Sequence, residues 1–175
     1  GSSGKVFQVF SPSDKKMLAL KLYHTRSFDT AEGVIRFQRE VAAGSQLEHP
    51  NIVKIYGQGA TGSSRYLTMD YVDGENLRDY LTREISVNQI VLWLKTLADA
   101  IQYMHDSGIF HRDLKTENIM VTKSGEVKIM DLGLAKTNVF ATMTRLGTSV
   151  GTLAYMSPQQ AVGMPIDASS DVYSL

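Results

Sequence analysis

The chain has 175 residues, about the length of one domain, and 43% of its residues are apolar while 21% are charged. Equal numbers of acidic and basic residues give a formal net charge of zero, so nothing indicates a nucleic-acid partner or an anionic membrane surface. The absence of cysteine excludes disulfides and thiol chemistry, and no apolar run reaches the roughly 18 residues of a membrane span. We expect a cytoplasmic protein, or the cytoplasmic domain of a larger, membrane-anchored one.

The first part of the chain reads as strands with one helix between them. Apolar runs predict strands over 5–10 and 17–22, separated by the turn-rich hexamer SPSDKK. Apolar residues recurring near the 3.6-residue period predict a helix over 29–47. Two more strands are expected over 52–57 and 66–72, joined by a GATGSS turn.

The second part is built on a long helix. Residues 86–105 are the clearest helical segment, and Ser86 and Gln89 at its start have the spacing of a capping box. The expected buried stripe of this helix is Ile90, Leu94, Leu97, Ile101 and Met104. Two short strands follow near 119–121 and 126–130, and the rest of the chain is rich in loop-forming residues.

The stretch HRDLKTEN, residues 111–118, carries the strongest indication of chemistry. An Asp and an Asn on one loop can perform two tasks around a triphosphate. Asp113 can accept the proton of an attacking hydroxyl, and Asn118 can offer its amide oxygen to Mg²⁺. Lys115 can reach the phosphoryl group in transfer. The alternative is a polar surface loop that follows a helix.

The stretch IMDLGLA, residues 129–135, places Asp131 on a sharp turn after an apolar strand. A carboxylate in this position is a natural ligand for a Mg²⁺ ion that bridges phosphate oxygens. Asp-x-Gly turns are common, so this motif alone is weak. Its significance comes from Asp113 upstream, because a strand-turn-strand unit between the two can bring both carboxylates to one site.

The stretch LALKL, residues 18–22, holds a single lysine in an apolar strand. A buried ammonium is costly unless it finds an anion, so Lys21 predicts a phosphate or a carboxylate partner. Glu40 on the following helix can supply the carboxylate and orient Lys21 toward the α- and β-phosphates. The alternative is an edge-strand lysine whose ammonium reaches solvent.

The opening GSSGKVFQVF has two interpretations. GSSG is typical of a flexible spacer or cloning scar, which has no place in the fold. Gly1, Gly4 and Val6 also fit the back half of a G-x-G-x-x-G-x-V phosphate-covering loop. The spacing in sequence between Val6 and Lys21 favours the second interpretation, a phosphate-covering loop.

Taken in order, these stretches resemble the eukaryotic-type (Hanks-type) protein kinases. The glycine loop, strand lysine, helix glutamate, HRDLKTEN, DLG in place of DFG, and GTLAYMSPQ all follow the family's sequence order. The last motif continues as SPQQA, close to the SPEQA form common in bacterial Ser/Thr kinases, with Gln159 in place of the glutamate.

The resemblance implies an α+β fold with two lobes. Residues 1–72 would form an N-lobe with an antiparallel sheet and one helix, and residues 73–175 a mainly helical C-lobe. DVYSL, residues 171–175, resembles the start of the long buried helix of that lobe, with Asp171 as its anchor. We therefore expect an incomplete C-lobe and a fragment of the domain.

The resemblance also implies a role for each matching residue. Lys21, paired with Glu40, would hold the α- and β-phosphates of ATP. Asn118 and Asp131 would bind Mg²⁺, or Mn²⁺ in its place, while Asp113 orients the acceptor hydroxyl and Lys115 contacts the phosphoryl group. The residues expected around ATP are Gly1, Gly4, Val6, Ala19, Lys21, Met69, Asp70, Val72 and Met120.

The implied activity is the transfer of the γ-phosphoryl group of ATP to Ser or Thr hydroxyls of protein substrates. Lys115 and Thr152 favour a Ser/Thr kinase over a tyrosine kinase. Arg112 beside Asp113 is typical of kinases controlled by a phosphate on the following loop. Candidate autophosphorylation sites are Thr142, Thr144, Thr148 and Ser149, each of which has the alternative of a solvated loop hydroxyl.

Two other functions compete with this interpretation. A pseudokinase would use the same fold as a scaffold or nucleotide-binding interaction module, and it would be indicated by loss of the catalytic residues. Those residues are Lys21, Asp113, Asn118 and Asp131, and all are present. A small-molecule kinase of related fold would lack a peptide-docking segment, whereas residues 151–158 are intact here.

Overall fold

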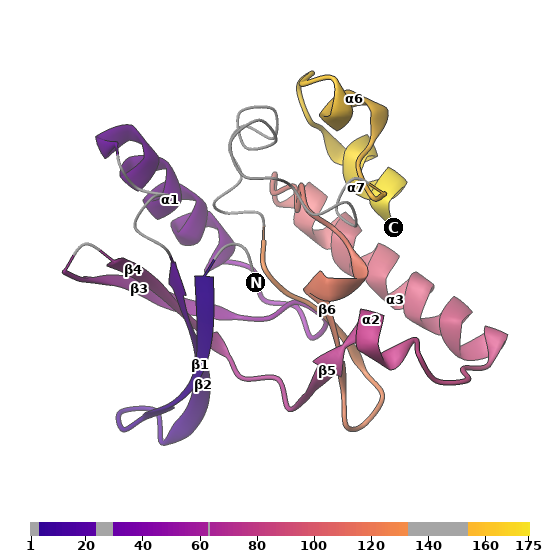
Figure 1. The fold of residues 1–175 in the computed structure, drawn as a ribbon, viewed down its shortest axis with the longest axis horizontal. Helices are drawn as coiled ribbons and strands as arrows, with labels where there is room; N and C mark the ends of the chain where they lie inside the picture. The colour runs from indigo at the N-terminus through magenta and orange to yellow at the C-terminus, as the bar shows by residue number, and fades with distance from the viewer. Residues whose placement is uncertain (1–3, 24–29, 63, 133–153) are drawn as a thin grey trace. The chain divides into compact units, whose positions relative to one another are not determined.

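The computed structural model of the protein describes residues 4–23, 30–62, 64–132 and 154–175. The chain divides into two compact units (Figure 1). Unit 1 comprises Gly1–Glu48 and Val53–Asp73, and unit 2 comprises His49–Ile52 and Gly74–Leu175. Each unit has its own sheet and its own helices, so each is described by itself.

Unit 1 is built on a four-stranded sheet with the strand order β1-β2-β4-β3. Every neighbouring pair in this sheet is antiparallel. The four strands are β1 (Gly4–Ser11), β2 (Lys16–Tyr23), β3 (Ile55–Thr61) and β4 (Ser64–Asp70). Along β2, Ala19, Lys21 and Tyr23 are buried and alternate with less buried residues, as expected for a strand with one covered face.

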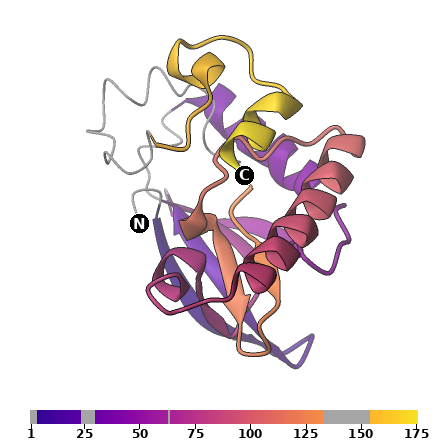
Figure 2. The same ribbon diagram turned by 90° about the vertical axis from the view of Figure 1, so that its right-hand side faces the viewer.

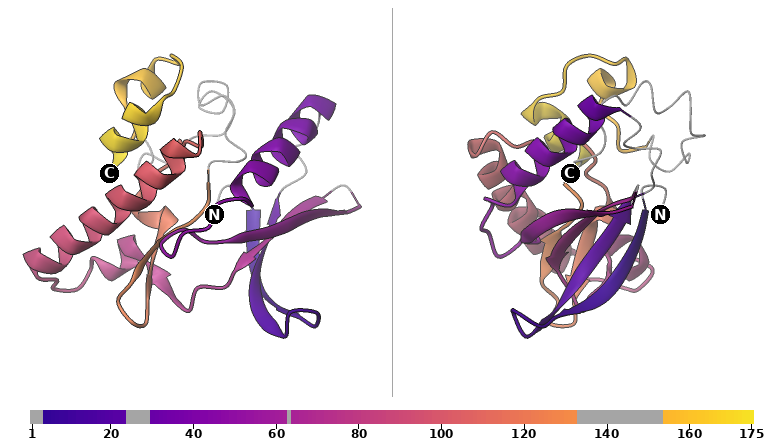
Figure 3. Two further views of the ribbon diagram at one scale, coloured as in Figure 1. Left: turned by 180° about the vertical axis from the view of Figure 1, so that it is seen from behind. Right: turned by 90° about the vertical axis from the view of Figure 1, so that its left-hand side faces the viewer.

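Helix α1 (Ala31–Gly44) packs on this covered face (Figure 3, right). Its Phe37 meets the ring of Tyr23 edge-on, with the two ring centroids 5.2 Å apart. The helix begins at Thr30, whose side chain accepts a hydrogen bond from the Gly33 amide. It ends three residues before the predicted limit of 47, because the Ser45 amide turns back onto carbonyls of the last helical turn.

Unit 2 contains a three-stranded antiparallel sheet in the order β5-β6-β7, together with most of the helices. Helix α3 runs along this sheet, in contact with β7 (Figure 2). The strands are β5 (Gly74–Asn76), β6 (Ile119–Thr122) and β7 (Val127–Ile129). The helices are α2 (Leu77–Tyr80), α3 (Val87–Asp106), the short 3₁₀ helix η2 (Thr116–Asn118), α6 (Pro158–Ala161) and α7 (Ala168–Ser174).

The buried face of α3 agrees with the predicted one at Leu97, Ile101 and Met104 and differs from it at the start of the helix. Ile90 and Leu94 are 36% and 43% exposed, so placing them in the core was wrong. Trp93 is buried instead, because its indole Nε1 donates to the Gly125 carbonyl at 2.9 Å and its ring meets Tyr80 edge-on. The full buried set is Trp93, Leu97, Ala100, Ile101 and Met104.

The segment His49–Ile52, which follows α1 in the sequence, belongs to unit 2. The Asn51 side chain donates to the Val127 carbonyl at 2.8 Å, and the Asn51 carbonyl accepts from the Ile129 amide at 2.7 Å. Asn51 therefore binds β7 from both its side chain and its backbone, and Ile52 adds a parallel bridge to Ile129. Among the described residues, no helix has the length and apolar character needed to cross a lipid bilayer.

Candidate active site

The loop that follows α3 brings three of the predicted residues together. Asn118 is buried, and its side-chain amide donates to the Asp113 carbonyl oxygen at 2.7 Å and to Asp113 Oδ2 at 3.0 Å. The single turn of η2 makes this possible, because the Asn118 amide returns to the Lys115 carbonyl at 2.9 Å. The Lys115 ammonium lies 3.7 Å from Asp113 Oδ2. A half-buried carboxylate therefore sits between an amide donor and a cation.

The backbone before Asp113 is held by Asp171 on α7, a carboxylate only 1% exposed. Its Oδ2 accepts from the His111 amide at 2.8 Å and from His105 Nε2 at 2.9 Å. Its Oδ1 accepts from the Arg112 amide at 2.8 Å. Arg112 has a φ of 64°, a left-handed conformation that ordinary residues adopt only when their surroundings enforce it. The three hydrogen bonds of Asp171 supply that enforcement.

His111 contributes a further constraint from inside the core, where its side chain is fully buried. Its Nε2 lies 2.8 Å from the Met130 carbonyl, and its Nδ1 accepts from the Asp113 amide at 3.3 Å. A carbonyl can only accept and an amide can only donate, so Nε2 carries the hydrogen. The imidazole thus links the Asp113 backbone to the chain immediately before Asp131.

Asp131 lies two residues beyond the end of β7, and the intervening Met130 amide donates to the Asn118 carbonyl at 2.8 Å. Its φ of 52° is again left-handed, a conformation that Asp tolerates better than most residues. Leu132, which replaces the usual Phe of the motif, is buried and so retains the apolar side chain at that position.

The donor set suits a magnesium-like cation. The amide nitrogen of Asn118 donates to Asp113, and its amide oxygen is an acceptor of the kind that Mg²⁺ prefers. Asp131 adds a carboxylate. The described residues contain no group of three or more His, Cys, Asp or Glu side chains able to hold a metal. Few protein ligands are expected for Mg²⁺, which usually completes its shell with substrate phosphates and water.

The predicted nucleotide residues of unit 1 share one face of the sheet. In the strand register Val6 is opposite Lys21, and Ala19 is opposite Met69. Opposite residues of antiparallel strands point to the same side, which here is the side covered by α1 at Tyr23. Lys21, Ala19 and Met69 are buried, whereas Val6 is 57% exposed. Glu40 is half-buried on α1, one helical turn after Phe37.

Gly4 is the first described residue of the chain, and it is an integral part of β1. A Cβ placed on it would lie 2.2 Å from the Leu22 carbonyl oxygen, so only glycine fits opposite Tyr23. This close approach explains why position 4 is a glycine, whereas a flexible spacer would have no such packing requirement.

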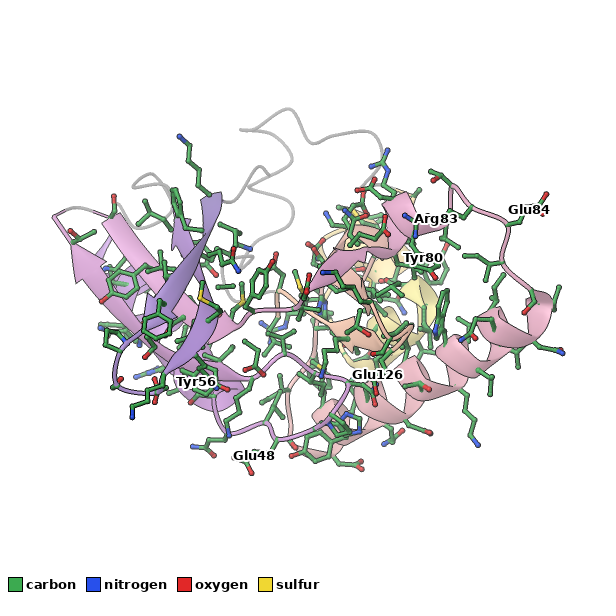
Figure 4. All side chains as sticks on the ribbon, turned by 90° about the horizontal axis from the view of Figure 1, so that it is seen from below. Glu48, Tyr56, Tyr80, Arg83, Glu84 and Glu126 are labelled. Atoms are coloured by element: carbon green, nitrogen blue, oxygen red, sulfur yellow. The ribbon has the colours of Figure 1, made fainter. Side chains whose placement is uncertain are left out.

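Asp70 and Val72 stand at the end of β4 and in the segment that leads to unit 2. The Asp70 amide donates to the Lys54 carbonyl at 2.9 Å. On the opposite, outer face of the sheet, the hydroxyl of Tyr56 donates to Asp70 Oδ1 at 2.6 Å (Figure 4 labels Tyr56). Lys16 donates in turn to Tyr56, so the start of the connecting segment is fixed by side chains from three strands.

Met120, the remaining predicted nucleotide contact, lies on β6 of unit 2 between Asn76 and Lys128. The other predicted positions are outside the described residues: Gly1, Thr142, Thr144, Thr148, Ser149 and Thr152. The sequence interpretation missed His105, His111 and Gln160 as supports of the loop. HRD marks His111 by its place in the motif, and the Ser157-x-x-Gln160 spacing marks Gln160 as part of a capping box, whereas His105 carries no local signal.

A family model described as "Protein kinase domain" matches residues 1–175. The chain belongs to the protein kinase family. Its kinase relatives include a probable serine/threonine-protein kinase of Clostridium acetobutylicum, 35% identical over 99% of this chain and 27% of the relative. Serine/threonine-protein kinase pkn3 of Myxococcus xanthus is 37% identical over all of this chain and 34% of its own length. This chain therefore spans about a third or less of these two curated relatives.

The kinase fold is also found in solved structures. The crystal structure of the Mycobacterium tuberculosis PknI kinase domain superimposes with a TM-score of 0.79 at 25% identity. The match covers 99% of this chain and 66% of that domain. The expected resemblance to bacterial Ser/Thr kinases and the expected kinase-like α+β fold are thus confirmed.

Proposed function

We propose that this chain carries catalytic residues of an ATP-dependent protein serine/threonine kinase. The observation that carries the proposal is the pair of hydrogen bonds from Asn118 to Asp113, with the Lys115 ammonium 3.7 Å from the same carboxylate. This arrangement presents a carboxylate in a fixed orientation next to a cation and an amide donor. The chemistry of these protein groups is complementary to that of a hydroxyl nucleophile, a triphosphate and a divalent cation.

In the proposed reaction, Asp113 accepts the proton of a Ser or Thr hydroxyl, and the hydroxyl oxygen forms a bond to the γ-phosphorus of ATP. The bond from that phosphorus to the β,γ-bridging oxygen breaks, and ADP leaves. The positive charge of Lys115 attracts the phosphoryl oxygens as they move toward the acceptor. Asn118 keeps the Asp113 carboxylate in one orientation throughout. Most of the rate enhancement would come from positioning and charge neutralisation, since phosphoryl transfer needs little covalent chemistry from the protein.

Asn118 and Asp131 would hold the divalent cation, Mg²⁺ or Mn²⁺. When bound, the ion neutralises negative charge on the phosphate oxygens. In unit 1, Val6, Ala19 and Met69 would provide apolar contacts for the adenine, and Lys21 an ammonium for the α- and β-phosphates. The Asp70 and Val72 backbone would recognise the adenine edge, and Gly4, Glu40 and Met120 keep the roles that the family resemblance gives them.

The substrates we propose are proteins with Ser or Thr acceptors. Lys115 supports this class over tyrosine, and the bacterial Ser/Thr kinase names of the relatives support it too. Autophosphorylation is proposed at the loop threonines, Thr142, Thr144 and Thr148, where a phosphate would find the guanidinium of Arg112. A cytoplasmic location fits ATP as the phosphate donor.

The test is phosphate transfer from radiolabelled ATP by the full-length protein, alone and with a generic Ser/Thr substrate such as myelin basic protein. The Asp131→Asn variant should lose nearly all transfer, because it removes the carboxylate proposed to hold the cation. Asp99→Asn makes the same change at an exposed position of α3 and should transfer as the wild type does. Equal transfer by Asp131→Asn and wild type would contradict the kinase assignment.

A further inference from the structure

Gln160, in the last part of the chain, has a buried side-chain amide. The proposed reaction does not use this amide. Gln160 lies on α6, is only 4% exposed, and follows Gln159, the residue that replaces the family glutamate. Burying a side-chain amide is costly unless both of its ends are hydrogen-bonded. The partners of this amide therefore indicate what the residue does.

Both ends of the Gln160 amide are occupied. Its Oε1 accepts from the Ser157 amide at 3.0 Å, which forms one half of a capping box at the start of α6. Its Nε2 donates to the Arg112 carbonyl at 2.9 Å, across 48 residues of sequence. Because one partner can only donate and the other can only accept, the orientation of the amide is fixed.

The Arg112 carbonyl belongs to the peptide group that joins Arg112 to Asp113. The other polar atom of that group, the Asp113 amide, donates to His111 Nδ1 at 3.3 Å. A peptide group is planar, so holding its oxygen and its nitrogen fixes the plane itself. That plane contains the Asp113 Cα, so it fixes the atom from which the Asp113 side chain leaves the backbone. Gln160 thus acts one peptide group away from the proposed catalytic carboxylate.

The segment that carries Gln160 is itself held in place by hydrogen bonds. The Ser157 hydroxyl is buried and donates to the Ser170 hydroxyl on α7 at 2.9 Å. The Ser174 hydroxyl donates to the Tyr155 carbonyl at 2.7 Å, and the Tyr155 hydroxyl shares a hydrogen bond of 2.9 Å with Thr116 Oγ1. Residues 154–161 are therefore tied both to α7 and to the catalytic loop, and Gln160 provides the contact nearest to Asp113.

We propose that Gln160 is a positioning residue for phosphoryl transfer, which orients Asp113 by holding the Arg112 carbonyl. The inference rests on the proposed function, because it concerns the carboxylate to which that function assigns the acceptor proton. It adds a residue outside the catalytic motifs, and it links the segment 154–161 to the placement of the reacting group. The left-handed φ of Arg112 is a conformation that its surroundings must hold, and Gln160 adds a hydrogen bond at the Arg112 carbonyl to the one that Asp171 accepts from the Arg112 amide.

The Gln160→Glu variant removes one of the two hydrogen bonds of the Gln160 side chain and keeps the other. A carboxylate of the same shape still accepts from the Ser157 amide, but it cannot donate to the Arg112 carbonyl and repels that oxygen. We expect kcat to fall about tenfold to a hundredfold, since a small misplacement of a reacting group has effects of that size. The KM for ATP should stay within about twofold of wild type, because nothing in this contact touches the nucleotide residues of unit 1. Gln159→Glu, the same change one residue earlier, should leave both constants unchanged.

The Gln160→Met variant removes the donor without adding charge, and it carries the test if the Glu variant does not fold. Both variants and the wild type are assayed as full-length proteins, with hydrogen exchange of the backbone around Asp113 measured in parallel. The proposal expects lower kcat, a near-normal KM for ATP and faster exchange at 111–113 with little change in α3. Wild-type kcat in a Met variant that binds nucleotide would overturn it.

Three outcomes would count against the proposal, and each has a different meaning. Loss of nucleotide binding in both Gln160 variants would mean that Gln160 serves the fold and not the placement of Asp113. A wild-type protein that transfers no phosphate would refute the proposed function, and this inference with it. An active wild type beside equally active Gln160 variants would refute the inference alone.

Discussion

Asp171 fixes His111 from the far end of the chain, with Oδ2 accepting the His111 backbone amide at 2.8 Å across 60 residues of sequence. The carboxylate is almost fully buried and serves two further donors, the Arg112 amide and His105 Nε2. A buried carboxylate with three hydrogen bonds is a strong local constraint, because losing it leaves buried donors without acceptors. Helix α7, which lies beside α3 (Figure 3, left), therefore holds the catalytic loop in place.

The first prediction concerns this constraint. Asp171→Ala should lower the free energy of unfolding by about 3–5 kcal/mol, since it strands the His111 and Arg112 amides and the His105 imidazole in the interior. Urea unfolding of the full-length protein measures the loss. Asp99→Ala, at an exposed position of α3, should stay within about 0.5 kcal/mol of wild type. A loss for Asp171→Ala as small as that of the control would contradict the role given to Asp171.

The second prediction concerns the Asn118 amide. Asn118→Asp replaces the donor that holds Asp113 with a second carboxylate about 3 Å away, so the two groups repel. We expect kcat to fall about a hundredfold, with a higher divalent-cation concentration needed for half-maximal rate. Steady-state kinetics across a Mg²⁺ titration provide the measurement. Asn88→Asp, on the exposed start of α3, is the matched control, and a kcat equal to that control would refute the prediction.

Several features could be predicted from local sequence because they depend on neighbours in the chain. The apolar run over 17–22 indicates a strand, and β2 (Lys16–Tyr23) contains it. Ser86 indicates the start of α3, and its side chain does accept from the Gln89 amide. In these cases periodicity and capping act over three or four residues, which a single sequence contains in full.

The buried face of α3 could be predicted only in part, since Leu97, Ile101 and Met104 are buried as expected but Ile90 and Leu94 are not. The helix has two apolar stripes, and the periodicity of Ile90 and Leu94 is as regular as that of the true core. The choice is made by Trp93, whose indole reaches the Gly125 carbonyl 32 residues later. The contact of Gln160 with the Arg112 carbonyl could not be predicted for the same reason, since the two residues lie 48 apart in the sequence. The local Ser157-x-x-Gln160 spacing indicates only the capping box.

The third prediction follows from Trp93. Trp93→Phe keeps an aromatic ring beside Tyr80 but removes the hydrogen bond to the Gly125 carbonyl (Figure 4 labels Tyr80). The free energy of unfolding should fall by about 1–2 kcal/mol. Tyr80→Leu removes the ring contact instead, and it should cost about 0.5–1.5 kcal/mol beyond the area it buries. Chemical denaturation of both variants tests this, and an unchanged stability for Trp93→Phe would contradict it.

The fourth prediction concerns Asp167, the N-cap of α7. Hydrogen bonds from the Ser169 hydroxyl and then the Ser169 amide lower the pKa of this carboxyl below its ordinary value. A lowered folded pKa means that the stabilisation is present above the unfolded pKa of about 3.9 and is lost as pH falls through the folded pKa. An NMR titration of the Asp167 carboxyl should show this, and Ser169→Ala should move the pKa upward. A folded pKa at or above the ordinary value would refute the assignment.

The central claim is that Asp113 acts on the acceptor hydroxyl while the nucleotide is held elsewhere. The most direct measurement is kcat for Ser/Thr phosphorylation by wild type and by Asp113→Asn, together with the dissociation constant of each for ATP. The account predicts a fall in kcat of about 10² to 10⁴, the range of general-base catalysis, with ATP affinity within about threefold of wild type. An Asp113→Asn protein that binds ATP and phosphorylates Ser and Thr at the wild-type rate would contradict it.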